Sequence, residues 1–199
     1  MASSFTEAHD FWWGAAFSKR FFHTVRSLYR TGCSTIHHSI DDIGARFEYQ
    51  RHPGKWDQTF ANLKSYQRAQ TPNCHLVLYC TVSFFNVYYI PEYLEWARTN
   101  FPEHKIILNM VHYPSHFSIK NLPPHTKSTL SQRFKYIDSK KYNLLHPQSI
   151  KTLIEFMGIG DDNLELMNAV KEIRRADKYR GEKFEEVFPE MVAALKNQA

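Results

Sequence analysis

In three stretches of the sequence, polar side chains that could bind a ligand lie at or directly after the end of an apolar run. Polar and charged groups at the end of a buried strand cost free energy unless water or a ligand solvates them. Together such groups can hold a polar cofactor, although the simpler alternative is that they mark where the chain leaves the core. The groups are Ser39, Asp41 and Asp42, then Thr81, Ser83 and Asn86, and last Asn109, His112 and Tyr113.

Two arginines follow the first of these stretches and suit the recognition of an anionic group. Arg46 and Arg51 lie in a polar segment that we expect to be a loop. A planar guanidinium donates two parallel hydrogen bonds to a carboxylate, which makes arginine a good anchor for an acidic ligand. The alternatives stay open, because Arg51 can instead form a surface ion pair with Glu48 or Asp57, and an aspartate such as Asp41 can cap the turn that follows it.

The cysteines do not form a metal-binding motif. Cys33, Cys74 and Cys80 have neither C-x-x-C nor C-x-x-x-C-x-x-C spacing, so we predict buried structural thiols and no metal site. A zinc site made from Cys33, His37 and His38 is disfavoured, because adjacent residues of a strand point to opposite faces. The sparse, odd number of cysteines favours a reducing compartment, and we expect the protein to be cytoplasmic.

The elements that would position these groups alternate between helix and strand. Such alternation is typical of a parallel α/β sheet with right-handed crossovers, in which ligand sites gather at the carboxyl ends of the strands. Periodicity and breakers predict a helix over 15–30, a strand over 34–40, a helix over 57–68, a strand over 75–82, a helix from residue 91 and a strand over 105–111.

The pattern changes after Pro123 and Pro124, where the rest of the chain is predicted to be helical. We therefore divide the chain into an α/β part over residues 1–124 and a helical C-terminal extension over residues 125–199. Four helices are expected in the extension, over about 126–139, 147–157, 162–176 and 181–196.

Composition argues against several classes of protein. The chain has 199 residues of which 43% are hydrophobic, as in globular proteins, and no apolar run approaches the roughly 20 residues of a membrane span. The formal net charge is +5, but lysines and arginines alternate with acids, most clearly over residues 171–186. That segment is expected to be a solvated helix face, and a nucleic-acid partner is therefore not expected.

Three segments carry a resemblance to a known family. The stretch IHHSIDDIGARFEYQRHPGKWDQTFANL, followed by YCTVSFFNVYYIPEYLEWA, resembles the second half of a radical S-adenosylmethionine (radical SAM) barrel, a form of TIM barrel. The strand that ends in Ser-Ile-Asp is similar to the fourth strand of that family. The tail IRRADKYRGEKFEEVFPEM resembles the C-terminal helix of its twitch-domain subgroup. The resemblance implies a partial (βα) barrel of about three parallel strands, followed by the helical extension.

The resemblance also implies which residues contact S-adenosylmethionine. In the family, the serine of the Ser-Ile-Asp strand and an arginine beyond it hold the ribose or the carboxylate of the cofactor. Ser39 and Arg51 match those places, with Arg46 as an alternative to Arg51, and Asn86 matches a polar contact after the fifth strand. By position, the remaining candidates are Asp41, His112 and Tyr113, although Tyr113 can also be an aromatic residue of a turn.

Two parts of the family pattern are absent from the sequence. These are the C-x-x-x-C-x-x-C motif that binds the [4Fe–4S] cluster and the Gly-Gly-Glu-type stretch that binds the amino group of the cofactor. In addition, Asp42 stands where the family usually has glycine. We therefore expect a C-terminal fragment, truncated or split, that contributes part of the cofactor pocket but is inactive alone. Such a fragment would need a partner chain that supplies the other half of the barrel, or it would associate with itself. The alternative is that the chain is a non-catalytic relic or a self-associating binding module.

Overall fold

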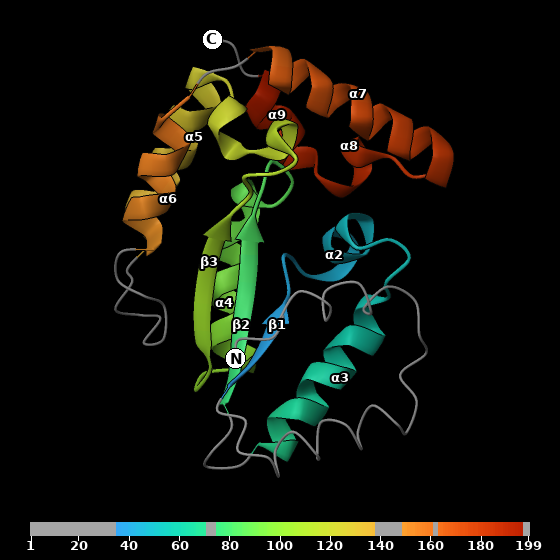
Figure 1. Ribbon diagram of the computed structural model, residues 1–199, viewed down its shortest axis with the longest axis vertical. Helices are drawn as coiled ribbons and strands as arrows, with labels where there is room; N and C mark the ends of the chain where they lie inside the picture. The colour runs from blue at the N-terminus through green and yellow to red at the C-terminus, as the bar shows by residue number, and fades with distance from the viewer. Residues whose placement is uncertain (1–34, 71–74, 138–148, 161–162, 197–199) are drawn as a thin grey trace, which may run out of the picture.

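The described residues form a parallel sheet of three strands. The computed structural model describes residues 35–70, 75–137, 149–160 and 163–196. The strands β1 (Thr35–Ser39), β2 (His75–Val82) and β3 (Lys105–Met110) lie in the order β1–β2–β3, and their carboxyl ends meet at one edge of the sheet (Figure 1). The predicted α/β class is confirmed, and the helix predicted over 15–30 lies outside the described residues.

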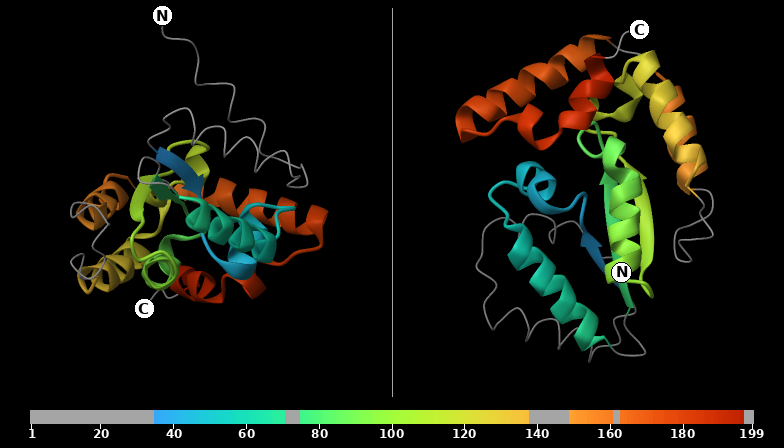
Figure 2. Two further views of the ribbon diagram at one scale, coloured as in Figure 1. Left: turned by 90° about the horizontal axis from the view of Figure 1, so that it is seen from below. Right: turned by 180° about the vertical axis from the view of Figure 1, so that it is seen from behind.

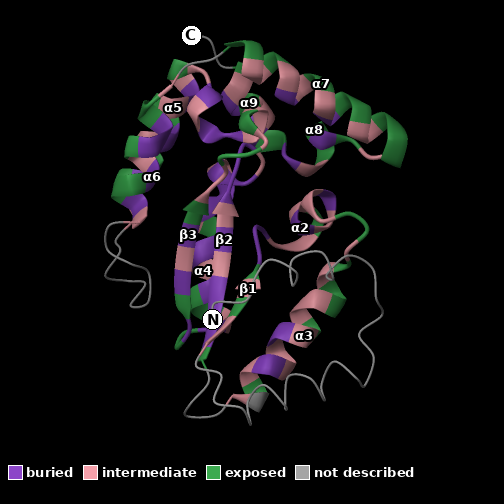
Figure 3. Cartoon of the chain, in the orientation of Figure 1, coloured by how far each residue is buried: buried purple, intermediate pink, exposed green. Residues whose placement is uncertain are grey.

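The central strand β2 carries the most apolar sequence and has a neighbour on each side. Ser39 of β1 lies opposite Tyr79, and Thr81 lies opposite Asn109 of β3. One face of the sheet is fully packed. Successive side chains of a strand point to opposite faces, so every second residue points to this face, and its apolar side chains fill the space under the covering helices. The buried residues of β2 on this face are Leu76, Leu78, Cys80 and Val82 (Figure 3).

Two helices cover this packed face. They are α3 (Trp56–Ala69) and α4 (Ile90–Asn100), and α4 lies directly against the strands in the right view of Figure 2. An aromatic cluster joins the two helices: the ring centroids of Trp56 and Trp96 are 5.3 Å apart, and Phe60 packs against both. The helices predicted in these two places are confirmed. A short 3₁₀ helix, η2 (Val87–Tyr89), leads from β2 into α4.

The segment after β1 is a helix, and the prediction of a loop there was wrong. The helix α2 (Gly44–Gln50) buries Phe47 and Tyr49 beneath it. Its apolar signal is short, since only two of its residues are buried and charged residues alternate with them. Gly44 begins the helix with φ of +58°, a conformation that other residues rarely adopt.

The helices α7 (Asn163–Arg180), α8 (Phe184–Val187) and α9 (Pro189–Lys196) form a roof over the carboxyl edge of the sheet, whereas α5 (Pro124–Lys135) and α6 (Ser149–Gly158) lie beside β3 (Figure 1). The predicted final helix is split, because Pro189 has no N–H with which to continue the preceding turn. The longest helix, α7, is rich in charged residues, and no described helix is long and apolar enough to cross a membrane. The elements after β3 are η3 (Ser115–Phe117), η4 (Ile119–Asn121), α5 (Pro124–Lys135), α6 (Ser149–Gly158), α7 (Asn163–Arg180), α8 (Phe184–Val187) and α9 (Pro189–Lys196).

Candidate functional site

Asp41 is the hub of the polar groups at the carboxyl edge of the sheet. It lies two residues after β1 and is only 8% exposed. Its Oδ1 accepts a hydrogen bond of 2.8 Å from the backbone N–H of Thr81 in β2. Its Oδ2 accepts a hydrogen bond from Nη2 of Arg51. The carboxylate therefore bridges two strands and an arginine, and these bonds do not cap the following turn.

Arg51 closes the group that the sequence predicted. It follows the last residue of α2, and its Nη2 lies 3.1 Å from Oγ of Ser39 as well as against Asp41. Ser39, Asp41 and Arg51 thus come together. Glu48, the alternative partner of Arg51, instead accepts a hydrogen bond of 2.9 Å from the backbone N–H of Trp56.

Asn86 lies beneath this group rather than facing open space. It is 1% exposed, and its Nδ2 donates to the backbone carbonyls of Asp41, at 2.5 Å, and Thr81, at 3.0 Å. Its Oδ1 accepts a hydrogen bond of 2.7 Å from the N–H of Ser83. Because a buried amide is costly unless its donors and acceptors are bonded, Asn86 fixes the ends of β1 and β2 relative to each other.

A second, deeper ion pair stands behind the site. Asp42 is fully buried and accepts a hydrogen bond of 3.0 Å from Nε of Arg46, whose Nη2 also lies 2.9 Å from Glu92. The Arg46 guanidinium lies over the ring of Tyr89, 4.1 Å from its centroid. Burial raises the pKa of Asp42 to about 7, because it outweighs the opposing attraction of Arg46. Arg46 is therefore committed to this network, and Arg51 is the arginine at the cavity.

A cavity of about 380 Å³ opens at the carboxyl edge, between the strand ends and the roof. This volume falls within the range of small-molecule sites. Its three sides combine charged or polar side chains with apolar ones, a composition that suits a ligand with both charged and aromatic parts. The polar wall includes Asp41, Arg51, Thr81 and Ser83, the apolar wall includes Phe85, Val111 and Phe117, and the roof includes Glu172, Ile173 and Arg180.

The roof is held on the sheet by contacts between α2 and α7. The Tyr49 hydroxyl donates a hydrogen bond of 2.7 Å to Oδ1 of Asp177, and Oδ2 of Asp177 accepts one of 2.9 Å from the N–H of Phe184. Arg180 donates to the carbonyl of Tyr49 at 3.0 Å. Burial, together with the hydrogen bond to Asp177, raises the pKa of Tyr49, so its hydroxyl keeps its proton. The cavity roof is therefore fixed to the wall that carries Arg51.

Two of the predicted contact residues lie away from the cavity. The imidazole of His112 packs edge-on against Phe156, with centroids 5.0 Å apart, and Tyr113 is 90% exposed. Between the strand end and these residues the chain turns outward, so that Val111 and Pro114 line the cavity in their place. The structure thus gathers Ser39, Asp41 and Arg51, places Asn86 behind them, and leaves His112 and Tyr113 on the surface.

Several cavity residues were not predicted from the sequence. Phe85 and Phe117, whose rings are 4.7 Å apart, have the same apolar pattern as core residues. Glu172 and Arg180 lie in the charged segment that was expected to be a solvated face. Only Phe85 had a signal in the sequence. It lies in the turn from Ser83 to Asn86 after β2, and residues that follow a strand end line the same edge of the sheet.

The described residues do not supply a metal centre. No group of three or more His, Cys, Asp or Glu among them is arranged to hold an ion. Cys80 is buried inside β2, and burial followed by the nearby Asp41 raises its thiol pKa well above the usual value. Iron is bound by the thiolate, which this environment disfavours, so Cys80 does not fit a [4Fe–4S] cluster. Cys33 and Cys74, with the zinc alternative that involved Cys33, lie outside the described residues.

The two adjacent histidines of β1 face opposite sides of the sheet, as predicted. His37 packs against Tyr79 of β2 at 5.4 Å between ring centroids, whereas His38 packs against Tyr66 of α3 at 4.4 Å. Burial and then the charge of His37 lower the pKa of His38 to about 4, so it is neutral in the fold.

Comparisons of the chain with protein-family models, curated proteins and solved structures find no match.

Proposed function

We propose that the edge cavity is part of an S-adenosylmethionine site, and that the chain is the C-terminal part of a radical SAM enzyme of the twitch-domain type. One observation carries the proposal. Ser39, Asp41 and Arg51 converge by hydrogen bonds, and Asp41 and Arg51 line a ligand-sized cavity at the carboxyl edge of a parallel sheet. This edge is where α/β folds bind their ligands.

The chemistry of the cavity fits the organic part of this cofactor. Arg51 would hold the carboxylate or a ribose hydroxyl, and Asp41 would accept from the ammonium group or from the ribose. Phe85 and Phe117 offer apolar surface for the adenine ring. In the proposed enzyme these residues would hold a cofactor that supplies radical chemistry, with the electron coming from an iron–sulfur cluster.

The sequence lacks the C-x-x-x-C-x-x-C motif that would bind the cluster, so we assign the cluster to a partner chain. The sheet itself favours a partner, because β1 and β3 are each paired along one edge only within the described residues. Unpaired strand edges readily pair with another chain. The partner is either a chain with the remaining strands or a second copy, and light scattering of the purified protein distinguishes a monomer from a dimer.

Ligand binding tests the proposal directly. Isothermal titration with S-adenosylhomocysteine, which has the same nucleoside and amino-acid groups, should show binding by the isolated chain. Arg51→Gln should weaken it about 10- to 100-fold, as expected for lost hydrogen bonds to a charged group. The control is Arg98→Gln, which removes an arginine from an exposed ion pair with Glu95 on α4. Absence of binding, or equal affinities for the Arg51 variant and the control, would refute the proposed site.

A second experiment tests the division of labour between chains. After anaerobic reconstitution with iron, sulfide and a reductant, the isolated chain should not bind a cluster or form deoxyadenosine. A brown protein that cleaves S-adenosylmethionine would contradict the assignment of the cluster to a partner. If the titration also shows no cofactor binding, the second candidate function, a non-catalytic self-associating module, replaces the first; a dimer in light scattering would support it.

A further inference from the structure

A groove runs along α7, beside the cavity at the sheet edge. The groove has a volume of about 660 Å³ and is lined by residues of the last three turns of the helix. Glu172, Ala176 and Arg180 line both the groove and the cavity, so the two spaces adjoin. Whatever lies in the groove is therefore placed next to Asp41 and Arg51.

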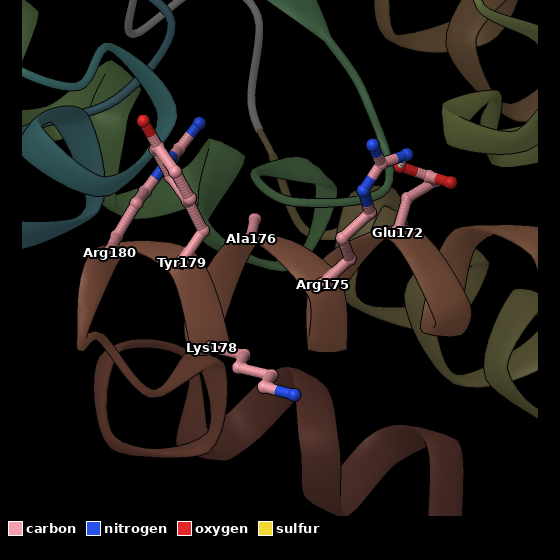
Figure 4. A pocket seen from close by; sticks show the side chains of 6 residues that line it. All are labelled: Glu172, Arg175, Ala176, Lys178, Tyr179 and Arg180. Atoms are coloured by element: carbon pink, nitrogen blue, oxygen red, sulfur yellow. Dashed lines mark ion pairs between the residues drawn. The ribbon is translucent and has the colours of Figure 1, made fainter.

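The side chains of the groove are arranged in a definite order along the helix. In Figure 4, Glu172, Arg175, Tyr179 and Arg180 project to one side of α7, with the small Ala176 between them, while Lys178 projects away. Tyr179 is 90% exposed although it is a large aromatic residue. The Arg175 side chain is 81% exposed, and its nearest acid is Glu172 at 3.7 Å. The face thus presents one uncovered ring flanked by two guanidinium groups.

The structure separates charges that alternate in the sequence. Asp177, which lies among the cations of the segment 171–186, turns inward and accepts hydrogen bonds from Tyr49 and Phe184. Glu182 lies beside His52 and Arg180 rather than on the groove. Because Lys178 projects away, two cations, Arg175 and Arg180, share the groove side of the helix with a single carboxylate, Glu172. A helix that was expected to be a balanced, solvated surface has a net positive face.

We propose that this groove binds single-stranded nucleic acid. Phosphates would pair with Arg175 and Arg180, and one base would stack on Tyr179, since proteins that bind single strands combine positive charge with exposed aromatic rings. An acidic peptide would use the arginines but would leave the ring without a partner, so the uncovered Tyr179 favours nucleic acid. This proposal goes beyond the cofactor site and does not depend on it.

The test is the fluorescence anisotropy of a labelled single strand of about 12 nucleotides, titrated with the full chain at low salt and without S-adenosylmethionine. We expect binding that weakens steeply as salt rises, because phosphate contacts release counterions. Tyr179→Ala should weaken binding about 5- to 150-fold, which is the range for the loss of one stacked base. Arg175→Gln should reduce the magnitude of the slope of log affinity against log salt by about one.

Matched controls separate the groove from charge in general. Arg174→Gln removes the same charge from an exposed position of the same helix that does not line the groove, and should leave the salt slope nearly unchanged. Tyr136→Ala removes a tyrosine that is 88% exposed at the end of α5, and should leave affinity unchanged. These positions are exposed, so the variants should fold, which circular dichroism can confirm.

Three outcomes would overturn the proposal. One is an absence of binding at low salt. Another is an equal effect of the Arg174 and Arg175 substitutions, which would indicate attraction to the whole helix. The third is equal competition by polyglutamate and by unlabelled strand, which would identify an acidic peptide as the ligand. Because the assay contains no cofactor, failure here leaves the S-adenosylmethionine titration unaffected, and the reverse is also true.

Discussion

Asp42 gives the sharpest test of the energetics behind the site, through the substitution Asp42→Asn. The carboxylate is fully buried against Arg46, and burial raises its pKa to about 7 from an ordinary value of 3.8. The folded protein therefore holds a proton on Asp42 between these two pH values, where the unfolded chain has lost it. It follows that the contribution of this group to stability is greatest below about pH 4 and is lost as the pH rises through about 7.

The size of this effect follows from the pKa difference. Each pKa unit corresponds to about 1.4 kcal/mol, so a difference of about three units amounts to about 4 kcal/mol over the whole window. Between about pH 4.5 and pH 8, roughly 3 kcal/mol of it should be seen. Asparagine has nearly the same shape, can still accept the bond from Arg46, and does not ionise. The variant should therefore gain about 3 kcal/mol relative to the wild type across this range.

The measurement is urea denaturation of both proteins at several pH values, reported as a difference in the free energy of unfolding. The difference is needed because His38, with its lowered pKa, has the opposite sign: its contribution is lost as the pH falls from about 6.5 to 4. The two groups nearly cancel in the wild type. The control is Asp57→Asn, which removes an exposed carboxylate from α3. A difference between wild type and Asp42→Asn that stays constant with pH would refute the reasoning.

Three further predictions follow from the described contacts. His38→Gln removes a group whose contribution to stability is lost as the pH falls from about 6.5 to 4, so the free energy of unfolding of the variant relative to the wild type should rise as the pH falls through that range; urea denaturation of both proteins measures this difference, and a difference that stays constant with pH would contradict it. Tyr49→Phe removes the bond to Asp177 and should cost about 1.5–3 kcal/mol, with faster hydrogen exchange in α7; unaltered exchange there would show that the roof is held by other contacts. Leu94→Ala, in the buried face of α4, should cost about 2–5 kcal/mol by thermal or urea unfolding, and a cost below 1 kcal/mol would mean that the helix is not packed on the sheet as described.

The sheet could be predicted because its signal is local. A run such as HLVLYCTV contains β-branched and apolar residues throughout, and its neighbours follow at the spacing of βα units. The convergence of Ser39, Asp41 and Arg51 was predictable for the same reason, since all three lie within 13 residues of one strand end. The short chain segment that joins these residues limits how far apart they can lie once the position of the strand is fixed.

The roof could not be predicted because its partners are distant in sequence. The bond from Tyr49 to Asp177 spans 128 residues, and nothing in either segment identifies the other. The outward turn after β3 had no signal either, so His112 and Tyr113 were predicted at the cavity although the structure places them on the surface. The helix α2 was missed because seven residues with two buried positions are too few for a clear helical period.

The inward turn of Asp177 has a consequence for how this protein could diversify. The carboxylate that holds α7 to the sheet faces one side of the helix, whereas Tyr179 and Arg175 face the other with little contact to the fold. Substitutions at exposed positions usually change stability by less than about 0.5 kcal/mol. Selection could therefore alter the outward residues of α7, and with them the choice of partner, while the scaffold stays intact. The anchoring residue and the exposed residues share one helix, but substitutions at the first act on stability and substitutions at the second act on the surface alone.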